Sequence, residues 1–549
     1  MFQRNQRSSW MVASKLQKRS LLIAANCIAG LSIFFFGYDQ GMMGGVNVSP
    51  DYVQTMGLGH VGADGEVVIT ETLLQGGIVA IYYLGTLIGC LFGGSFGDRY
   101  GRINTIALGT VWAIFGASLQ TSAQNHSWML GARVVNGIGT GILNAIVPAW
   151  AGEIAEYSSR GQFIAIEFTL NIFGVVVAYW LEYGLAFVDG GVSALRWRFP
   201  IGFQIIPLIF LLITCWFFPE SPRWLVKADR EDEAFYILQR LQGTEGEDVG
   251  KAESELADIR NVVALERKMA HGTSYFHMFF GIGSGKLHTG RRVQLVIWLQ
   301  IMQSWTGISG VTMFGPTIFA IAGYGPAKAQ WISGLNNVFY MFATLICVFT
   351  LDRIGRRMTL YWGSVVQGIA MFVGGGLIRA GLTATADGGT ATGFGAGAAS
   401  MVYLYTFVFG ATWLTVPWLY PAEIFPLCVR AKGNAWGVVG WSIGCATLTL
   451  VLPYIVSAIN EKLLYIFGAC NAISIPIVWA LYPESNQRTL EEMDMLFAAE
   501  TPWVWDAETN FARLKEQNSN LYHTKSRDIE DKTSISIEHN EEKSGLSLA

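Results

Sequence analysis

The chain has 549 residues, of which 52% are hydrophobic and only 14% are charged, and its formal net charge is −4. Soluble domains average roughly 25% charged residues, so this composition indicates a protein that crosses a membrane several times. The small negative charge provides no basic surface, and we therefore expect no nucleic-acid partner.

The first apolar run covers residues 21–46 and follows a polar, basic tail of residues 1–20. A cleavable signal peptide has an apolar core of about 7–15 residues, so this run is too long to be one. We expect it to insert and remain as the first transmembrane helix, with the tail in the cytoplasm.

Apolar runs long enough to cross a bilayer recur along the whole chain. They cover residues 21–46, 71–96, 103–122, 128–151, 162–184, 199–218, 293–321, 331–351, 359–380, 399–425, 433–457 and 463–482. The sequence therefore predicts an all-α membrane protein with twelve transmembrane helices.

The positions of Lys and Arg orient these spans. Basic residues gather in alternate short joints, for example at Arg99, Arg160, Arg353 and Arg430, whereas residues 47–70 contain no Lys or Arg. Because short cytoplasmic loops are enriched in these residues, the basic joints should be cytoplasmic. Both termini should then lie in the cytoplasm.

Two polar segments lie outside the spans. Residues 219–292 form a predicted cytoplasmic loop, in which residues 231–241 and 252–270 have helical spacing and i,i+4 charge pairs. We expect two short surface helices there. Residues 483–549 form a cytoplasmic tail that loses its hydrophobicity and should be largely disordered.

Three motif pairs recur in the same order, about half a chain apart. They are "GDRYGR" (97–102) with "LDRIGRR" (351–357), "AGEIAEYSSRG" (151–161) with "PAEIFPLCVRAKG" (421–433), and "PESPRW" (219–224) with "PES" (483–485). Chance does not plausibly produce three such pairs. The repeat predicts two pseudo-symmetric six-helix halves, residues 21–218 and 293–482, as in transporters whose halves rock about a site at mid-membrane.

The repeated motifs place opposite charges at the cytoplasmic rim of both halves. The residues concerned are Asp98, Arg102, Glu153, Arg160, Glu220, Arg223, Asp352, Arg356, Glu423 and Arg430. Such charges can pair across helices when the inner mouth is shut and separate when it opens, which predicts a cytoplasmic gate. The alternative is ordinary positive charge on the cytoplasmic side, balanced by nearby acids.

At these residues the sequence resembles the sugar porter family of the major facilitator superfamily, in particular fungal hexose and polyol transporters. The resemblance covers roughly residues 20–490. It is carried by "GYDQG" (37–41), "GDRYGR", "PESPRWL", "DRIGRR", "VPWLYPAEIFPLCVRAKGNA" (416–435) and "PES". It implies a twelve-helix fold, alternating access, and a sugar or polyol as the substrate.

Asp39 is the one formal charge in the first span. A carboxylate in hydrocarbon is expensive, so its presence suggests a function. By resemblance, proton-coupled members carry a carboxylate here, and Arg133 on span four matches its partner. Moving the Arg away would favour the protonated acid, which would couple a proton to the conformational change. The alternative is an ion pair that only holds spans one and four together.

By resemblance, Gln300, Gln303 and Trp418 match family positions that bind the sugar, and Ser309 stands where the family has Asn. On span five Phe168 replaces the usual Gln, beside Glu167 and one turn from Asn171, while Asn337 lies near the usual Asn of span eight. We expect all of these except Phe168 to contact substrate, in a cavity with fewer amides than a glucose site. Glu167 could instead carry protons or pair with a polar neighbour.

Together these features predict a monomeric, plasma-membrane secondary transporter that imports a sugar or polyol with a proton. The partners are then the solute, the proton and the lipid bilayer. A transporter of a non-sugar metabolite, or a nutrient sensor that does not transport, are the alternatives. We expect no enzyme activity, cofactor or metal site, because the spans contain no nucleophile–base pair or metal-ligand cluster.

Overall fold

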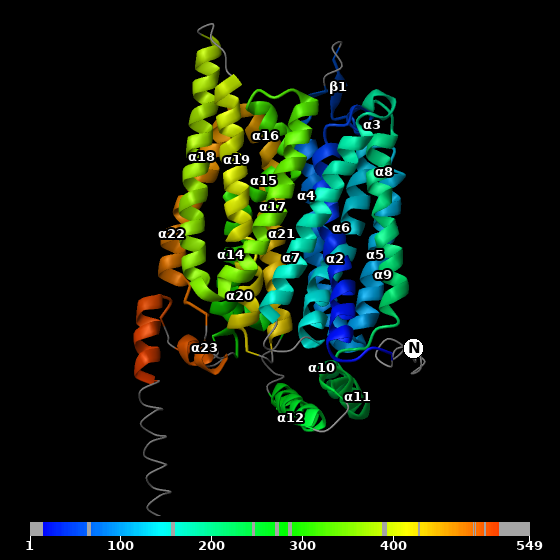
Figure 1. The fold of residues 1–549 in the computed structure, drawn as a ribbon, viewed down its shortest axis with the longest axis vertical. Helices are drawn as coiled ribbons and strands as arrows, with labels where there is room; N and C mark the ends of the chain where they lie inside the picture. The colour runs from blue at the N-terminus through cyan, green and yellow to red at the C-terminus, as the bar shows by residue number, and fades with distance from the viewer. Residues whose placement is uncertain are drawn as a thin grey trace, which may run out of the picture.

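The structure is a computed structural model. It describes residues 15–62, 67–154, 160–243, 247–268, 274–283, 288–386, 392–426, 429–486, 488, 490–498 and 501–514. The helices run along the long axis of the molecule (Figure 1). One end carries the N-terminal region and the helices α10 (Pro222–Lys227), α11 (Glu231–Gln242), α12 (Glu247–Lys268) and α23 (Leu490–Phe497), and we call it the terminal side. The other end, the hairpin side, carries the antiparallel strands β1 (Gly59–Val61) and β2 (Val67–Ile69).

Ten segments of the described chain are helices long and apolar enough to cross a membrane. They are α2 (Lys18–Val46), α4 (Thr72–Tyr100), α5 (Arg102–Thr121), α6 (His126–Ile154), α7 (Arg160–Leu185), α8 (Leu195–Phe203) with α9 (Ile205–Cys215), α18 (Arg356–Ala386), α19 (Thr392–Ala411) with α20 (Val416–Ile424), α21 (Arg430–Ile459) and α22 (Lys462–Leu481). The other two predicted spans are helical as well. One is α17 (Pro326–Ile354), and the other is divided into α14 (Thr289–Gln303), the π-helical turn η5 (Ser304–Ile308), α15 (Ser309–Met313) and α16 (Gly315–Ile321). The predicted all-α bundle is confirmed.

The seventh and tenth spans are broken at mid-length, and both breaks have a local cause. In the seventh span the chain passes through η5, where Gly307 has φ 118°, a conformation that side chains other than glycine rarely adopt. In the tenth span the helix is interrupted over residues 412–415, and α20 then begins with Pro417 near its start. Because a proline has no N–H to donate, it suits the first turn of the new helix.

Small residues let α2 and α7 approach closely. A Cβ atom on Gly37 would lie 1.8 Å from the backbone oxygen of Asn171, and one on Gly41 would lie 2.8 Å from Cα of Val175. Without side chains at these positions the two backbones pack directly, as in other membrane helix pairs. This packing fixes Asp39, which lies between the two glycines, inside the bundle.

The two halves meet along two helix pairs. In the first pair, the Oγ1 of Thr86 on α4 and the Oγ of Ser442 on α21 form a hydrogen bond of 2.7 Å. In the second, the Oγ1 atoms of Thr169 on α7 and Thr344 on α17 lie 2.9 Å apart. The interface between the halves therefore runs beside α2 and the broken spans.

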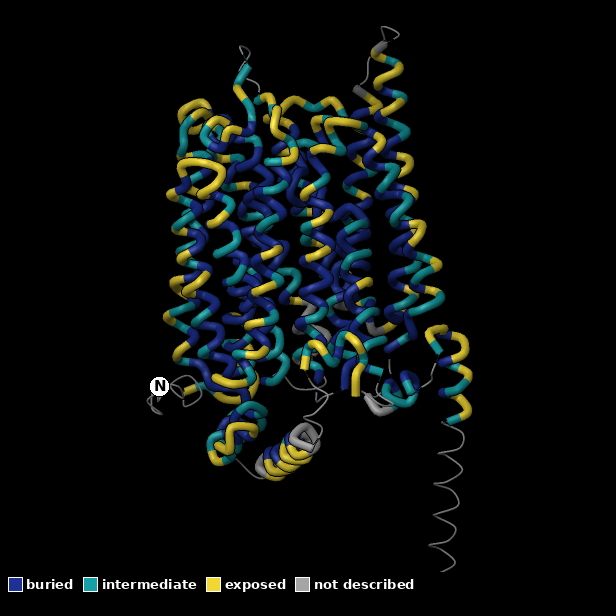
Figure 2. Tube along the Cα trace, turned by 180° about the vertical axis from the view of Figure 1, so that it is seen from behind, coloured by how far each residue is buried: buried dark blue, intermediate teal, exposed yellow. Residues whose placement is uncertain are grey.

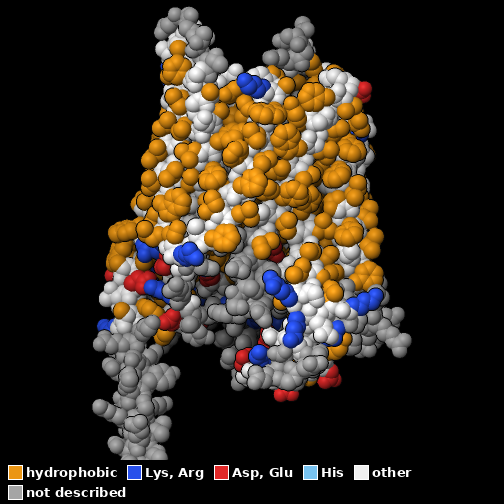
Figure 3. All heavy atoms as spheres, viewed as in Figure 1, with side chains coloured by type: hydrophobic (Ala, Val, Ile, Leu, Met, Phe, Trp, Pro, Cys, Tyr) orange, Lys and Arg blue, Asp and Glu red, His pale blue; other side chains and the backbone are white. Residues whose placement is uncertain are grey.

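The outside of the bundle is apolar. The exposed residues lie on the outer faces of the helices and the buried ones between them (Figure 2), and hydrophobic side chains cover the flank from one end to the other (Figure 3). Phe349 and Ile206, for example, are 72% and 62% exposed. Such a surface is stable only in lipid, which agrees with a multi-pass membrane protein.

The structure has the helices α11 and α12 in the segments where two surface helices were expected. Within residues 483–549, which we expected to be largely disordered, the described part contains α23. Here α23 packs against the bundle, where Asp494 on α23 forms an ion pair of 2.8 Å with Arg292 on α14. Residues 515–549 lie outside the described part.

The α2–α7 contact generates a prediction. Gly37→Ala should destabilise the protein, because its Cβ would overlap a backbone atom and force the helices apart, at a cost of about 1–3 kcal/mol or more. Thermal unfolding, monitored by size-exclusion chromatography, measures this loss of stability. Gly131→Ala on α6 is the matched control, since its Cβ would have no neighbour within 4 Å. Equal unfolding temperatures for the two variants would show that α2 and α7 do not pack this way.

Candidate functional site

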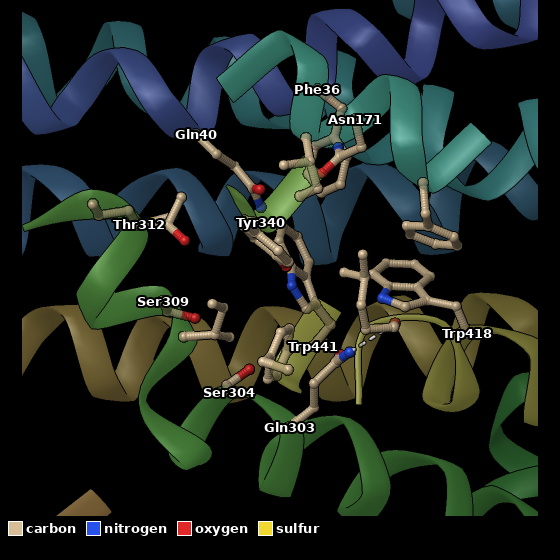
Figure 4. Close-up of a pocket in the computed structure, with 16 residues that line it drawn as sticks. Phe36, Gln40, Asn171, Gln303, Ser304, Ser309, Thr312, Tyr340, Trp418 and Trp441 are labelled. Atoms are coloured by element: carbon tan, nitrogen blue, oxygen red, sulfur yellow. Dashed lines mark hydrogen bonds between the residues drawn. The ribbon is translucent and has the colours of Figure 1, made fainter. Parts of the chain in front are cut away.

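A cavity lies between the two halves, beside both broken spans (Figure 4). About 510 Å³ of its space is not filled by atoms, a volume that includes space open to solvent. Its lining residues are Phe36, Gln40, Phe168, Asn171, Ile172, Gln303, Ser304, Ile308, Ser309, Thr312, Met313, Tyr340, Phe409, Leu414, Trp418 and Trp441. Because none of these described residues is charged, the cavity suits an uncharged molecule.

Two glutamines of α14 satisfy the backbone carbonyls that the break in the tenth span exposes. The Nε2 of Gln303 donates to the carbonyl oxygens of Trp413 and Leu414 at 2.7 and 3.0 Å, and the Nε2 of Gln300 donates to Pro417 O at 3.1 Å. Carbonyls accept but do not donate, so these contacts fix the orientation of both amides. Their Oε1 atoms accept no hydrogen bond from the described residues.

An aromatic wall forms one side of the cavity, and we use this name for Phe36, Phe168, Trp418 and Trp441. The ring centroids of Phe36 and Trp441 are 5.1 Å apart, those of Trp441 and Trp418 are 5.9 Å apart, and those of Trp418 and Phe168 are 5.5 Å apart. Phe36 and Phe168 come from the first half of the chain, and the tryptophans come from the second. The aromatic wall therefore spans the junction of the halves.

The structure brings four of the predicted substrate residues to the cavity: Gln303, Ser309, Trp418 and Asn171. Three others are buried but do not line it: Gln300, Glu167 and Asn337. Gln300 is turned toward Pro417, and on α7 Phe168 and Asn171 line the cavity in place of Glu167. On α17, Tyr340, one helical turn beyond Asn337, lines the cavity instead.

Sequence reasoning missed several lining residues, including Gln40, Thr312, Tyr340 and Phe409. Helical spacing could have found Gln40, because it lies one turn after Phe36 and next to Asp39. No sequence signal distinguishes Phe409 from the other apolar residues of its span.

A further buried acid, Glu182 on α7, was also missed. It accepts a hydrogen bond of 2.9 Å from the backbone N–H of Gly45.

Asp39 and Arg133 meet in the interior, as the resemblance implied. They are 1% and 2% exposed, and Nη1 of Arg133 lies 3.6 Å from Oδ1 of Asp39. The Nδ2 of Asn136 donates to the same oxygen at 3.1 Å, while Oδ2 accepts no hydrogen bond from the described residues. The guanidinium carbon also lies 4.8 Å from the ring centre of Tyr82. The pair is thus buried away from solvent, and Tyr82 also lies close enough to Asp39 to interact with it.

Each half carries one charge cluster at the terminal side, and the two clusters share one design. In the first half Arg102 forms ion pairs with Glu153 at 2.9 Å and Asp98 at 3.0 Å, and its backbone N–H donates to Glu220 at 2.7 Å. In the second half Arg356 forms an ion pair with Glu423 at 2.6 Å.

The second cluster contains an acid that the sequence analysis did not single out. Glu484 accepts from the backbone N–H groups of Arg356 and Arg357 at 2.9 and 3.0 Å. It therefore holds the start of α18 as Glu220 holds the start of α5, where the helix dipole favours an acid. The repeated "PES" motif could have indicated it.

All of these described ion pairs join helices of the same half. Of the other predicted gate residues, Arg223 lies close enough to Glu153 to interact electrostatically, and Arg430 donates to Phe425 O at 3.4 Å. The side chains of Arg160 and Asp352 lie outside the described residues.

Within the described chain, no group of three or more His, Cys, Asp or Glu side chains could hold a metal ion.

Comparisons with known proteins agree with this architecture. The sequence model of the family described as "Sugar (and other) transporter" matches residues 25–497. The chain belongs to this family. The transporter is 32% identical over 473 residues to the MFS-type transporter oryC of Aspergillus oryzae, covering 86% of this chain and 84% of oryC. It is 28% identical over 497 residues to the sugar transporter STL1 of Saccharomyces cerevisiae, covering 89% of this chain and 83% of STL1.

Among solved structures, the transporter resembles the proton:xylose symporter XylE bound to 6-bromo-6-deoxy-D-glucose. The TM-score is 0.71 and the identity is 23%, and the likeness covers 87% of this chain and 99% of XylE. At this identity the likeness shows the major facilitator fold. The two-half architecture predicted from the motif repeat is therefore the architecture of a known transporter class.

The glutamine contacts generate a prediction. Gln303→Leu should lower stability by about 1–3 kcal/mol, because it leaves two buried carbonyl groups without a donor. Ligand-free thermal unfolding of the purified protein measures this loss. Gln40→Leu is the matched control, since Gln40 also lines the cavity but donates to no carbonyl within the described chain. If both variants unfold at the same temperature as the wild-type protein, Gln303 does not stabilise the broken span.

Proposed function

We propose that the protein is a secondary active transporter that imports an uncharged sugar or polyol together with a proton by alternating access. The observation that carries this proposal is the buried pair of Asp39 and Arg133, since the residue after Asp39, Gln40, lines an uncharged cavity at the junction of two similar halves. The family and the XylE fold support it. We place the protein in the plasma membrane, as a monomer, with its terminal side in the cytoplasm.

Alternating access is supported by contacts that close the cavity toward the hairpin side. The hydroxyl of Tyr179 on α7 donates to Thr312 O on α15 at 2.6 Å, and the hydroxyl of Tyr83 on α4 lies 3.2 Å from the sulfur of Met313. Each contact joins one half to the other. Rocking of the halves would break both contacts and open the cavity to the outside.

Proton coupling follows from the electrostatics of the buried pair. When Arg133 is close, the ionised form of Asp39 is stabilised; when Arg133 moves away, an apolar interior favours the neutral acid. Gln40, the next residue, lines the cavity, so binding of a solute and protonation of Asp39 act on the same turn of α2. A solute that displaces α2 would therefore change the proton affinity of Asp39.

The clusters of Arg102 and Arg356 form the proposed cytoplasmic gate. Each arginine pairs with an acid of its own half at the terminal side, and in this proposal the pairs form when the inner mouth is shut and separate when it opens. We keep Arg160, Arg223, Asp352 and Arg430 in this gate as proposals. Their positions next to the two clusters in the repeated motifs support this assignment.

Glu167 is proposed as a second proton-binding group. It is buried on α7 next to Phe168, which lines the cavity, and its Oε1 accepts no hydrogen bond from the described residues. A buried carboxyl without a cation is stable only when it is protonated. Opening of the cavity to water would let it release that proton.

A second candidate function is transport of a non-sugar organic metabolite. The aromatic wall favours it, because such a wall gives a large apolar area and few groups that recognise hydroxyls. A panel of labelled sugars, polyols and apolar metabolites, tested for uptake at two external pH values in cells without their own hexose carriers, distinguishes the two candidates. Uptake of a sugar or polyol that rises at acidic external pH supports the first candidate.

Asp39→Asn tests the coupling. The variant keeps the shape of the side chain but binds no proton, so gradient-driven accumulation should fall to equilibration, while exchange of labelled for unlabelled solute continues. Both rates are measured in proteoliposomes. Glu71→Gln, a change at an exposed acid on the hairpin side, is the control and should accumulate normally. Unchanged accumulation by Asp39→Asn would show that the pair is only structural.

Glu167→Gln tests the second acid separately. If Glu167 releases a proton in each cycle, the number of protons taken up per solute should fall in this variant, because one of two groups is lost. Parallel measurement of solute and proton uptake gives this ratio. A wild-type ratio together with wild-type affinity for the solute would remove Glu167 from both the proton path and the substrate site.

A further inference from the structure

A helix of residues 504–514 follows α23 and begins beside the terminal-side end of α22 (Figure 1). One face of this helix is buried against the protein at Val504 and Phe511. Arg488 also holds the helix, through an ion pair of 2.8 Å with Glu508. The helix is therefore docked on the protein by contacts that do not involve its other side.

Two tryptophans at the start of this segment remain exposed. Trp503 and Trp505 are 44% and 43% exposed, and their rings are stacked, with centroids 5.1 Å apart and 9° between the planes. The ring centroid of Trp505 also lies 5.1 Å from that of Trp479 on α22, which is 56% exposed. We call these three residues the tryptophan cluster. Large aromatic side chains gathered on an exposed surface mark a site that contacts a protein or a membrane.

The length of α22 sets the level of the tryptophan cluster relative to a bilayer. This helix has 20 residues, which at about 1.5 Å per residue cover roughly 30 Å, the thickness of the hydrocarbon core. Trp479 lies in the last turn of α22, so its ring should lie at the boundary between hydrocarbon and headgroups. The Trp505 ring contacts Trp479 and lies at the same boundary, although it belongs to a segment that follows the last span.

A basic side chain lies at the same level. The Nη2 of Arg357, near the start of α18, donates to the backbone oxygen of Trp479 at 2.9 Å. Lys and Arg at the ends of membrane helices reach toward the headgroups, and tryptophans gather at this level because the indole ring is apolar and its N–H is polar. The tryptophan cluster therefore has both the composition and the position of a membrane-interface site.

We propose that the tryptophan cluster is a lipid-binding surface, at which Trp503 and Trp505 enter the interfacial layer of the bilayer on the terminal side. The occupant is phospholipid, in contact through its glycerol group and the upper part of its acyl chains. Ala472 and Pro476 precede Trp479 on the exposed face of α22, so the cluster continues a face that lies in lipid. The chain beyond the last span is then held against the membrane at this point.

Site-specific photocrosslinking in the full-length protein tests this proposal. Trp505→Bpa, where Bpa is the photoreactive aromatic residue p-benzoylphenylalanine, is illuminated in vesicles of palmitoyl-oleoyl phosphatidylcholine. Mass spectrometry should then find this peptide with the added mass of one phospholipid. Arg513→Bpa, at an exposed position of the same helix, is the matched control. It should give at least about tenfold less lipid adduct, because about 12 Å of helix separates it from the boundary.

A second measurement needs no variant, so it stands even where Trp505→Bpa does not fold. The wild-type protein is reconstituted with a phosphatidylcholine that carries a diazirine at the upper end of one acyl chain. Illumination should label the peptide that contains Trp503 and Trp505. The surface helix α11 lies on the same side of the molecule but away from the bundle (Figure 1), and it should not be labelled.

The outcomes decide which molecule covers the tryptophan cluster. Lipid adducts at position 505 that are absent at position 513 support the proposal. Crosslinks at position 505 between two copies of the chain would show that a second copy covers the cluster, and would overturn it. Lipid adducts at position 505 that are no more frequent than at position 513 would show that the cluster faces water, and would also overturn it. Neither result bears on the solute that the protein carries.

Discussion

A carboxylate and a guanidinium group lie together inside a bundle whose outer surface is apolar. Neither charge of Asp39 or Arg133 can reach water, so each depends on the other, and removing one partner from such a pair typically costs about 3–5 kcal/mol. The direct backbone packing of α2 on α7 holds Asp39 in this position. Everything proposed for proton coupling depends on this constraint, because a carboxylate buried beside a cation favours its neutral form once that cation moves away.

The second constraint comes from the breaks in the seventh and tenth spans. Broken helices create the cavity, but they also expose carbonyl groups that must be satisfied within the bundle. Gln300 and Gln303 satisfy those of the tenth span, so their amide N–H groups are already used by the backbone. The chemistry that the cavity offers is thus a consequence of how the backbone is stabilised around it.

Much of the architecture could be predicted from the sequence, because span length, basic joints and the motif repeat are local or periodic signals. The pairing of Asp39 with Arg133 came from the family resemblance, since nothing local links two helices so far apart in the chain. Tyr340 and Phe409 could not be predicted, because one helical turn decides whether a residue faces the cavity. The role of Gln303 was unpredictable for another reason: its partners are backbone groups freed by a distant break.

The most direct measurement of the central claim follows both species in one experiment. Purified protein in proteoliposomes with a pH-sensitive dye inside is given an inward gradient of labelled solute at equal internal and external pH. The account predicts that solute entry acidifies the interior, and that the acidification disappears when Asp39 is replaced by Asn. Entry of the solute with no change in internal pH would contradict proton coupling through the buried pair.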